Sequence, residues 1–293
     1  MIGMKSIGII GTGHIGGLLA KKFIETAVVK PQELCAANRT PGKLNRLVND
    51  LKITPCKDNI GVAQASDIIF ICVRPAEAKA VIAEIKPALT PQNLIISTVS
   101  DVKLADLKAW SGIDCVRIIP SVTCEYGHGV TVISFPDGIA DSLKESVIRL
   151  FKGFSMPYVT AEENISSLSD LTSSSPAIIA AVIQEFAKAA AEKSNGKIPV
   201  ADSEELIRET LLGTAVLLDR LSKSEPAERG NTQSGKNAGG KSPFDTLIES
   251  VATKGGITAE GVIAVREKAP ELYEKVLTNM QNKHRKVEQS LKN

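Results

Sequence analysis

A glycine-rich hexapeptide near the start of the chain has the spacing of a phosphate-binding turn. Residues 11–16 read Gly-Thr-Gly-His-Ile-Gly, directly after an apolar run and directly before a helical pattern. In that setting the first glycine permits a tight turn, the second lets the backbone approach a pyrophosphate, and the third lets the helix pack closely on the strand. The N–H groups at the helix N-terminus then face the phosphates. The motif predicts a dinucleotide site; the alternative is a plain strand–turn–helix junction.

The residues after the second predicted strand distinguish between two dinucleotides. A site for NAD(H) usually places Asp or Glu there to bind the ribose 2′-hydroxyl. This chain has Asn38, Arg39 and Thr40 instead, so no carboxylate repels a 2′-phosphate and a guanidinium is available to pair with it. We therefore predict NADP(H) as the cofactor, with NAD(H) less favoured. Two alternatives stay open: Arg39 is a solvated loop residue, or the fingerprint serves a deazaflavin cofactor.

Two further segments follow predicted strands and are expected to line the same cleft. Val73-Arg74-Pro75 ends the fourth strand, and Pro120-Ser121 follows the sixth. Ligands of open α/β sheets bind beyond the carboxyl ends of the strands. The alternative is that each proline only stops its strand. The predicted cofactor-binding residues are Gly11, Gly13, His14, Ile15, Gly16, Asn38, Arg39, Thr40, Val73, Arg74, Pro75 and Pro120.

Strand and helix patterns alternate through the first half of the chain. Short apolar runs, typical of parallel strands buried on both faces, are separated by segments of helical periodicity. This alternation predicts parallel βαβ units in a doubly wound, Rossmann-type sheet. The predicted strands are residues 5–10, 34–37, 53–56, 67–73, 94–98, 115–119, 130–135 and 158–160, and the predicted helices are residues 12–26, 43–50, 76–85, 104–110 and 142–151.

The second half of the chain has a different pattern. After about residue 161 strand signals disappear, and helices are predicted over 176–193, 203–221 and 244–252 and again after Thr258, with Asp202 or Ser203 as the N-cap of the second. Residues 222–242 contain no large apolar side chain, which predicts a flexible loop. We therefore predict an α/β Rossmann domain over 1–160 and an all-α dimerisation and substrate domain over 161–293.

The composition narrows the class of protein. The 293 residues carry a net charge of only +2, which gives no reason to expect nucleic acid or a membrane surface as a partner. The longest apolar runs are strand-sized, and no secretory signal is visible. Five cysteines without a CxxC pair and three histidines without an HExxH motif predict reduced thiols and no metal site. These features predict a cytoplasmic protein.

Six motifs, in order along the chain, resemble those of the pyrroline-5-carboxylate reductase family. The resemblance covers nearly the whole chain and rests on GTGHIG at 11–16, NRT at 38–40, CVRP at 72–75, RIIPSVT at 117–123, SSSPAI at 173–178 and KGGIT at 254–258. It implies an NAD(P)H-dependent oxidoreductase acting on a CH–NH bond, which reduces the cyclic imine pyrroline-5-carboxylate to proline in amino-acid biosynthesis. It also implies a helical domain that intertwines with a second subunit.

The resemblance also implies a substrate site. In the family a glycine loop and the start of the following helix hold the substrate carboxylate, and here Thr258 reads as the N-cap of that helix. The alternative is an ordinary glycine turn capped by threonine. The substrate-binding residues implied are Gly255, Gly256, Thr258 and Ser121, and the catalytic candidates, whose hydroxyls could relay a proton, are Thr258, Thr253 and Ser175.

The chain departs from the family at the substrate loop. Ile257 stands where the family has a threonine close to the imine nitrogen, and Lys254 stands where it has a proline. Loss of one such donor can cost on the order of 10²-fold in rate. The motifs at 119–123 and 254–261 also resemble the divergent reductase-like proteins of bacterial late-competence operons. A second hypothesis is therefore an NADP(H)-binding protein with a regulatory role or a different small-acid substrate.

Two further inferences concern reaction class and assembly. A β-hydroxyacid dehydrogenase is disfavoured, because residues 176–187 lack the lysine acid/base that this class needs on its first long C-terminal helix. The stretch 177–191 is too apolar for a free surface helix. Together with the family resemblance, this predicts a homodimer or higher homo-oligomer.

Overall fold

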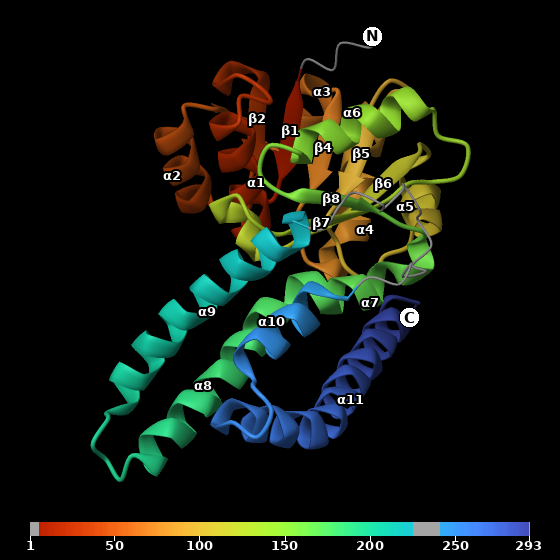
Figure 1. The fold of residues 1–293 in the computed structure, drawn as a ribbon. Helices are drawn as coiled ribbons and strands as arrows, with labels where there is room; N and C mark the ends of the chain where they lie inside the picture. Colours follow the sequence, from red (N-terminus) through yellow and green to blue (C-terminus); the bar gives the residue numbers. More distant parts are fainter. Residues whose placement is uncertain (1–5, 225–240, 293) are drawn as a thin grey trace. The chain divides into compact units, whose positions relative to one another are not determined.

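One eight-stranded sheet organises the first half of the chain (Figure 1). The computed structural model describes residues 6–224 and 241–292. Its strands follow the order β3-β2-β1-β4-β5-β6-β7-β8. They are β1 (Ile7–Ile10), β2 (Leu34–Ala37), β3 (Thr54–Pro55), β4 (Ile68–Ile71), β5 (Leu94–Ser97), β6 (Cys115–Pro120), β7 (Val130–Ser134) and β8 (Met156–Val159). The predicted Rossmann-type sheet is confirmed, with the central strands buried on both faces.

Helices cover both faces of the sheet, because each face presents a row of Ile, Val and Leu side chains. On one face Phe23, Phe70, Phe151 and Phe154 form an aromatic cluster, with ring centroids 5.2 Å apart for Phe23 and Phe70. The other face packs against a separate apolar cluster. The first face is covered by α1 (His14–Glu25), α2 (Pro41–Leu51) and α6 (Asp141–Phe151), and the second by α3 (Asn59–Ala65), α4 (Pro75–Ile85) and α5 (Leu104–Ser111).

The sheet is not parallel throughout, because one edge departs from the predicted parallel βαβ units. The first six strands in the sheet order, β3-β2-β1-β4-β5-β6, run parallel to one another. Strand β7 is antiparallel to β6, and β8 is parallel to β7. The reason is the connection between β6 and β7, which spans only residues 121–129 and contains a short 3₁₀ turn. A parallel crossover needs about a dozen residues or more, so this link allows only an antiparallel return.

A second difference lies between β3 and β4, where helix α3 (Asn59–Ala65) was not predicted. The helix has only 7 residues, so its apolar residues do not repeat often enough for a helical pattern to be recognised. Its start is nevertheless marked by a side-chain cap, since Asp58 Oδ1 accepts a hydrogen bond from Gly61 N at 2.8 Å. The third strand is also shorter than predicted.

The rest of the described chain is helical after β8, as predicted. Its helices are α7 (Ile165–Ser169), α8 (Ser175–Lys193), α9 (Val200–Ser224), α10 (Pro243–Val251) and α11 (Ile257–Lys292), with a π-helical turn over Asp170–Ser174 between α7 and α8. None of the described helices is long and apolar enough to cross a membrane.

The predicted starts of two helices are wrong. Helix α9 begins at Val200, and Ser203 N already donates to Pro199 O, so Asp202 and Ser203 lie within the first turn rather than at the N-cap. Helix α11 begins at Ile257, so Thr258 is its second residue and not its N-cap. The prediction of a loop over 222–242 is wrong at its start, because α9 continues to Ser224. Residues 225–240 lie outside the described part.

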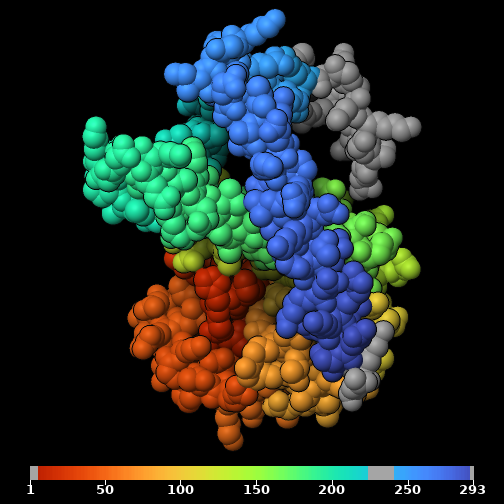
Figure 2. Space-filling view, turned by 90° about the horizontal axis from the view of Figure 1, so that it is seen from below, coloured from red at the N-terminus to blue at the C-terminus, as the bar shows by residue number. Residues whose placement is uncertain are grey.

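The chain divides into two compact units. The first unit contains the residues up to 176 and those from 278 onward, and the second contains residues 177–277. The end of α11 therefore belongs to the same unit as the sheet, and in Figure 2 its dark-blue atoms lie over the orange and yellow part of that unit. The strand-to-helix change near residue 160 lies within the first unit.

A half-buried histidine holds the end of α11 within its unit. His284 Nδ1 lies 2.7 Å from Asp101 Oδ1, and His284 Nε2 lies 2.9 Å from Asp170 Oδ1. Burial lowers the pKa of His284, but the hydrogen bonds that its ring makes to Asp170 and Asp101 outweigh this effect, so the net pKa is raised. Both carboxylates are almost fully buried, at 7% and 3% exposure of the side chains. A protonated ring between them satisfies both.

We predict that His284→Gln destabilises the protein by about 2–3 kcal/mol near pH 6, because two buried carboxylates lose their shared cation. Since the folded-state pKa of His284 is raised, its contribution is full below the pKa of the unfolded chain and disappears as pH rises through the folded-state value. Urea unfolding from about pH 6 to about pH 9 should therefore show the difference from wild type shrinking. The matched control is His128→Gln, at an exposed position. A difference that grows with pH would contradict the charged-ring account.

Candidate functional site

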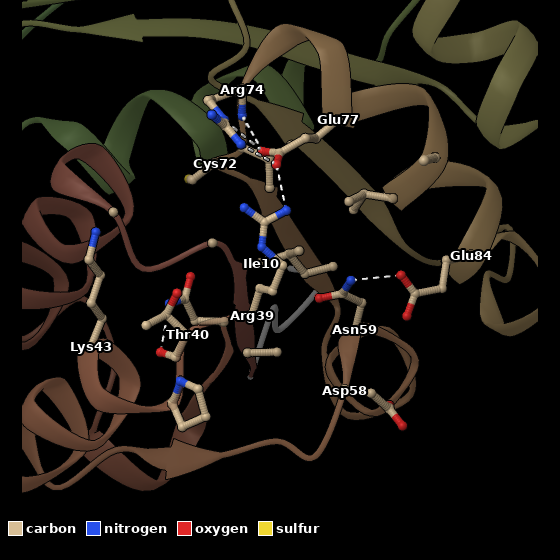
Figure 3. Close-up of a pocket in the computed structure, with 18 of the residues that line it drawn as sticks. Ile10, Arg39, Thr40, Lys43, Asp58, Asn59, Cys72, Arg74, Glu77 and Glu84 are labelled. Atoms are coloured by element: carbon tan, nitrogen blue, oxygen red, sulfur yellow. Dashed lines mark hydrogen bonds and ion pairs between the residues drawn. The ribbon is translucent and has the colours of Figure 1, made fainter.

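A pocket of about 1010 Å³ opens beyond the carboxyl ends of β1, β2 and β4 (Figure 3). This is the edge at which open α/β sheets bind ligands. The pocket brings together residues from the turns after three strands. The predicted cofactor-binding residues that line the pocket are Gly11, Gly13, Asn38, Arg39, Thr40, Val73 and Arg74.

The glycine turn is shaped by backbone contacts that no side chain could share. Gly11 has φ +93°, and a Cβ atom on it would lie 2.5 Å from the Cys72 carbonyl oxygen. A Cβ on Gly16 would lie 2.0 Å from the Gly11 carbonyl oxygen. A Cβ on Gly13, by contrast, would meet nothing within 4 Å, so the N-terminus of α1 is open to the pocket. The first turn of α1 carries no acidic residue that would repel an anion.

Asn38 connects this turn to the loop after β2. Its Oδ1 accepts a hydrogen bond from Thr12 N at 3.2 Å, and its Nδ2 donates to Thr40 O at 3.0 Å. Asn38 was predicted to bind the cofactor. The structure shows that its amide already holds the two pocket-lining loops together, which sets the position of the neighbouring Arg39.

Two arginines share one carboxylate at the pocket. Arg39 Nη1 lies 2.9 Å from Glu77 Oε1, and Arg74 Nη2 lies 2.8 Å from the same oxygen. The hydrogen bonds from Arg74, aided by the charge of Arg39, lower the pKa of Glu77 to about 2. Both guanidinium groups are largely exposed, so they remain accessible to an anion in the pocket.

Sequence reasoning missed several residues of the pocket wall. The clearest is Glu77, which lies in the first turn of α4 and reaches back to the backbone N–H of Arg74 in a capping box. An acidic residue three positions after a helix N-cap is a recognisable signal for this arrangement. The others were not foreseeable from spacing, because they come from α2, the turn before α3, the start of α3 and the far end of α4. The charged and amide residues missed are Lys43, Lys57, Asp58, Asn59, Glu77 and Glu84.

The remaining predicted cofactor residues are not among those that line this pocket. His14 and Ile15 form the first turn of α1, and Pro75 is the first residue of α4, where its fixed φ suits the helix start. Pro120 ends β6 at the β6–β7 pair. With Gly16, these positions stay predictions as cofactor contacts.

Ser121 and Ser175 are both in the sheet-containing unit. Ser121 is 1% exposed, and its hydroxyl lies 2.9 Å from Thr123 Oγ1. Ser175 Oγ donates to Asp170 O at 3.0 Å, across the π-helical turn. Ser173 Oγ donates to Pro120 O at 3.4 Å, which places the start of the Ser-Ser-Ser-Pro segment next to the end of β6.

The predicted substrate loop lies in the other unit and forms a tight turn before α11. Gly256 N donates to Thr253 O at 2.9 Å, and the Gly256 carbonyl accepts from Ala259 N at 3.1 Å, so Gly256 occupies the position before the helix. Gly255 has φ +74°. Ile257 is 95% exposed, and Thr253 and Thr258 are also exposed. The loop thus presents a helix N-terminus and two hydroxyls to its surroundings.

Two family models match the chain, one on each half. The model described as NADP oxidoreductase coenzyme F420-dependent matches residues 6–101. The model described as pyrroline-5-carboxylate reductase dimerisation matches residues 162–287. The chain is also 31% identical to pyrroline-5-carboxylate reductase of Methanobrevibacter smithii over 277 residues, covering 92% of this chain and 99% of the relative. The chain belongs to the pyrroline-5-carboxylate reductase family. It is an NAD(P)-dependent oxidoreductase of the class that acts on CH–NH bonds.

The chain also resembles proteins to which its identity is lower. ComE operon protein 4 of Bacillus subtilis is 27% identical over 288 residues, covering 97% of this chain and 96% of the relative. Among solved structures, a pyrroline-5-carboxylate reductase from Coxiella burnetii has a TM-score of 0.81 at 23% identity, covering 97% of this chain and 98% of that one. A Plasmodium falciparum pyrroline carboxylate reductase, solved with NADP bound, has a TM-score of 0.75 at 19% identity and full coverage of both chains. These structures share the fold.

We predict opposite effects from alanine at two adjacent glycines of α1. Gly16→Ala should destabilise the protein by about 2–3 kcal/mol, because the new Cβ would press on the Gly11 carbonyl. Gly17→Ala meets nothing within 4 Å and should stabilise by about 0.5–1 kcal/mol, since alanine favours the helix. Urea unfolding of both variants beside wild type measures the difference. Equal stability of the two variants would refute the close contact.

Proposed function

We propose that this protein reduces the cyclic imino acid pyrroline-5-carboxylate to proline, with NADPH as the hydride donor. The observation that carries the proposal is the pocket beyond β1, β2 and β4, where an open helix N-terminus and two arginines meet. The 31% identity to a pyrroline-5-carboxylate reductase over nearly the whole chain supports the substrate.

The residues of the pocket fit NADP(H) better than NAD(H). The open backbone at Gly13 and the N-terminus of α1 would hold the pyrophosphate. Arg39 and Thr40 follow β2, where an NAD(H) site would use a carboxylate, and would hold the 2′-phosphate. Bound NADPH would supply a hydride. The protein would supply binding and orientation, which convert an encounter into a reaction within one complex.

The turn before α11 is the proposed site of the substrate carboxylate. Gly255 and Gly256 carry no side chain that would cover the N-terminus of α11, and Thr258 adds a hydroxyl in the first turn of the helix. We propose Ser121 as a further substrate contact. Thr253 and Ser175 are proposed to relay the proton, together with Thr258.

A second function is favoured by one position in this turn. Ile257 has no hydrogen-bonding group where the family has threonine, and it is 95% exposed. The chain also resembles ComE operon protein 4 over nearly its full length. The alternative proposal is an NADP(H)-binding protein with a regulatory role, or a reductase of another small acid.

NADPH oxidation with pyrroline-5-carboxylate discriminates between the two functions. We expect slow turnover by the wild type, and an increase of about 10-fold or more in Ile257→Thr, because a hydroxyl is restored where charge develops. Ile257→Val is the matched control, since valine has the shape of threonine without its hydroxyl. No turnover by any of the three proteins would exclude this substrate and favour the regulatory alternative.

We also propose a homodimer. The helical unit exposes large apolar side chains on several helices, each more than half exposed: Phe186, Leu206, Leu212, Phe244 and Val265. Such surface is unusual on a monomer and marks an interaction site. The match of residues 162–287 to a dimerisation model supports a second copy of this chain as the partner. A cytoplasmic location is proposed on the five free cysteines.

Light scattering tests the assembly. The wild type should have at least twice the mass of the 31.1 kDa chain at micromolar concentration. Leu212→Asp should shift the protein towards the monomer, because a charge in an apolar interface must be desolvated. Glu205→Lys changes an exposed polar residue of the same helix and should leave the mass unchanged. A monomeric wild type would contradict the proposal.

A further inference from the structure

The loop after β2 and the first turn of α4 are joined across the pocket by a single ion pair. Arg39 extends from the first of these segments, and its Nη1 reaches Glu77 Oε1 on the second at 2.9 Å. In Figure 3 the Arg39 side chain points towards Glu77 and Arg74, whereas Asp58, Asn59 and Glu84 lie on the other side of it. The guanidinium is therefore directed by a contact with the opposite wall.

Glu77 is held in place without help from Arg39. Its carboxylate accepts from Arg74 Nη2 at 2.8 Å and from Arg74 Nε at 3.3 Å, and it also accepts from the Arg74 backbone N–H at 3.4 Å. The bond from the backbone N–H belongs to the capping box of α4, and the three bonds together hold the Glu77 side chain against the first turn of that helix. Arg39 is 81% exposed, while Glu77 is only 29% exposed. Glu77 is thus the fixed partner and Arg39 the adjustable one.

The cluster of Arg39, Arg74 and Glu77 has the charge needed to bind a further anion. Two guanidinium groups share one carboxylate, so the cluster has an excess of positive charge. The hydrogen bonds from Arg74 keep the pKa of Glu77 at about 2, so the carboxylate is ionised at neutral pH. A guanidinium carries five N–H donors in a planar fork. The contact with Glu77 occupies one edge of the Arg39 fork and leaves other donors for a phosphate.

We propose that Glu77 is a positioning residue for cofactor discrimination, which holds the Arg39 guanidinium where it receives the 2′-phosphate of NADP(H). The proposal rests on the proposed function, because it assumes NADP(H) in this pocket. Glu77 itself does not contact the phosphate, since two anions repel each other. Arg39 lies between them and bridges the two, in the order Arg74, Glu77, Arg39, phosphate. Pre-organising Arg39 in this way lowers the ordering cost of binding.

Binding titrations with Glu77→Gln test the proposal without turnover. Glutamine keeps the shape and the helix-capping ability of glutamate but removes the charge that holds Arg39. We expect about 5- to 10-fold weaker binding of NADPH and of adenosine 2′,5′-bisphosphate, and less than about 2-fold change for NADH and 5′-AMP. Glu84→Gln is the matched control, because Glu84 lines the same pocket from the same helix and contacts Asn59 rather than an arginine.

A double-mutant cycle shows whether Glu77 acts through Arg39. In an Arg39→Leu background, Glu77→Gln should have no further effect on the NADPH dissociation constant. Tighter NADPH binding by Glu77→Gln would overturn the proposal, since it would make Glu77 a competitor of the phosphate. Equal weakening for NADPH and NADH would also overturn it, because Glu77 would then serve the pocket as a whole.

The same titrations separate this proposal from the proposed function. A wild type that binds NADPH no more tightly than NADH would refute the NADP(H) site and the role of Glu77 together. A wild type that prefers NADPH, with an unchanged preference in Glu77→Gln, would refute the role of Glu77 alone. Thermal unfolding of each variant shows whether the fold is retained, and a destabilised Glu77→Gln is replaced by Glu77→Asp, whose shorter side chain should also weaken NADPH selectively.

Discussion

The close contact between Gly16 and the Gly11 carbonyl is the constraint on which the cofactor pocket depends. Helix α1 can start directly after β1 only because no side chain separates its first turn from the turn before it. The same contact brings the end of β4 against the turn, since Cys72 borders both glycines. Backbone packing therefore determines the shape of the pocket floor, and the polar side chains around the pocket extend from this rigid backbone.

Local pattern predicted most of the sheet, because buried parallel strands are short apolar runs with little else in them. Strand β2 was predicted to the residue, and β4 and β5 to within two residues at each end. The direction of β7 was not predicted, because an apolar run looks the same in either orientation. Only the length of the connection before it carries that information. The starts of α9 and α11 were misplaced because Ser, Thr and Asp, although preferred at the N-cap, also occur inside a first turn.

The parts of the site that consist of one contiguous segment were predictable from the sequence. The glycine turn and the Asn-Arg-Thr loop are recognised by type and spacing, and the structure brings them to one pocket. The contacts between segments were not foreseeable. Glu77 and Arg39 are 38 residues apart in sequence, and His284 is 183 residues from Asp101. Such pairs form because the elements pack against each other, and no periodicity within either segment predicts them.

The two parts of the proposed chemistry are under different physical constraints. The nucleotide turn is enclosed by backbone atoms, so almost any substitution at Gly11 or Gly16 would disturb the fold. The turn before α11 is exposed, and a side chain at Ile257 meets little of its own chain. Folding therefore preserves the first site whatever the substrate, while the second is free to change with function. For this reason the fold identifies the cofactor chemistry more firmly than the molecule that is reduced.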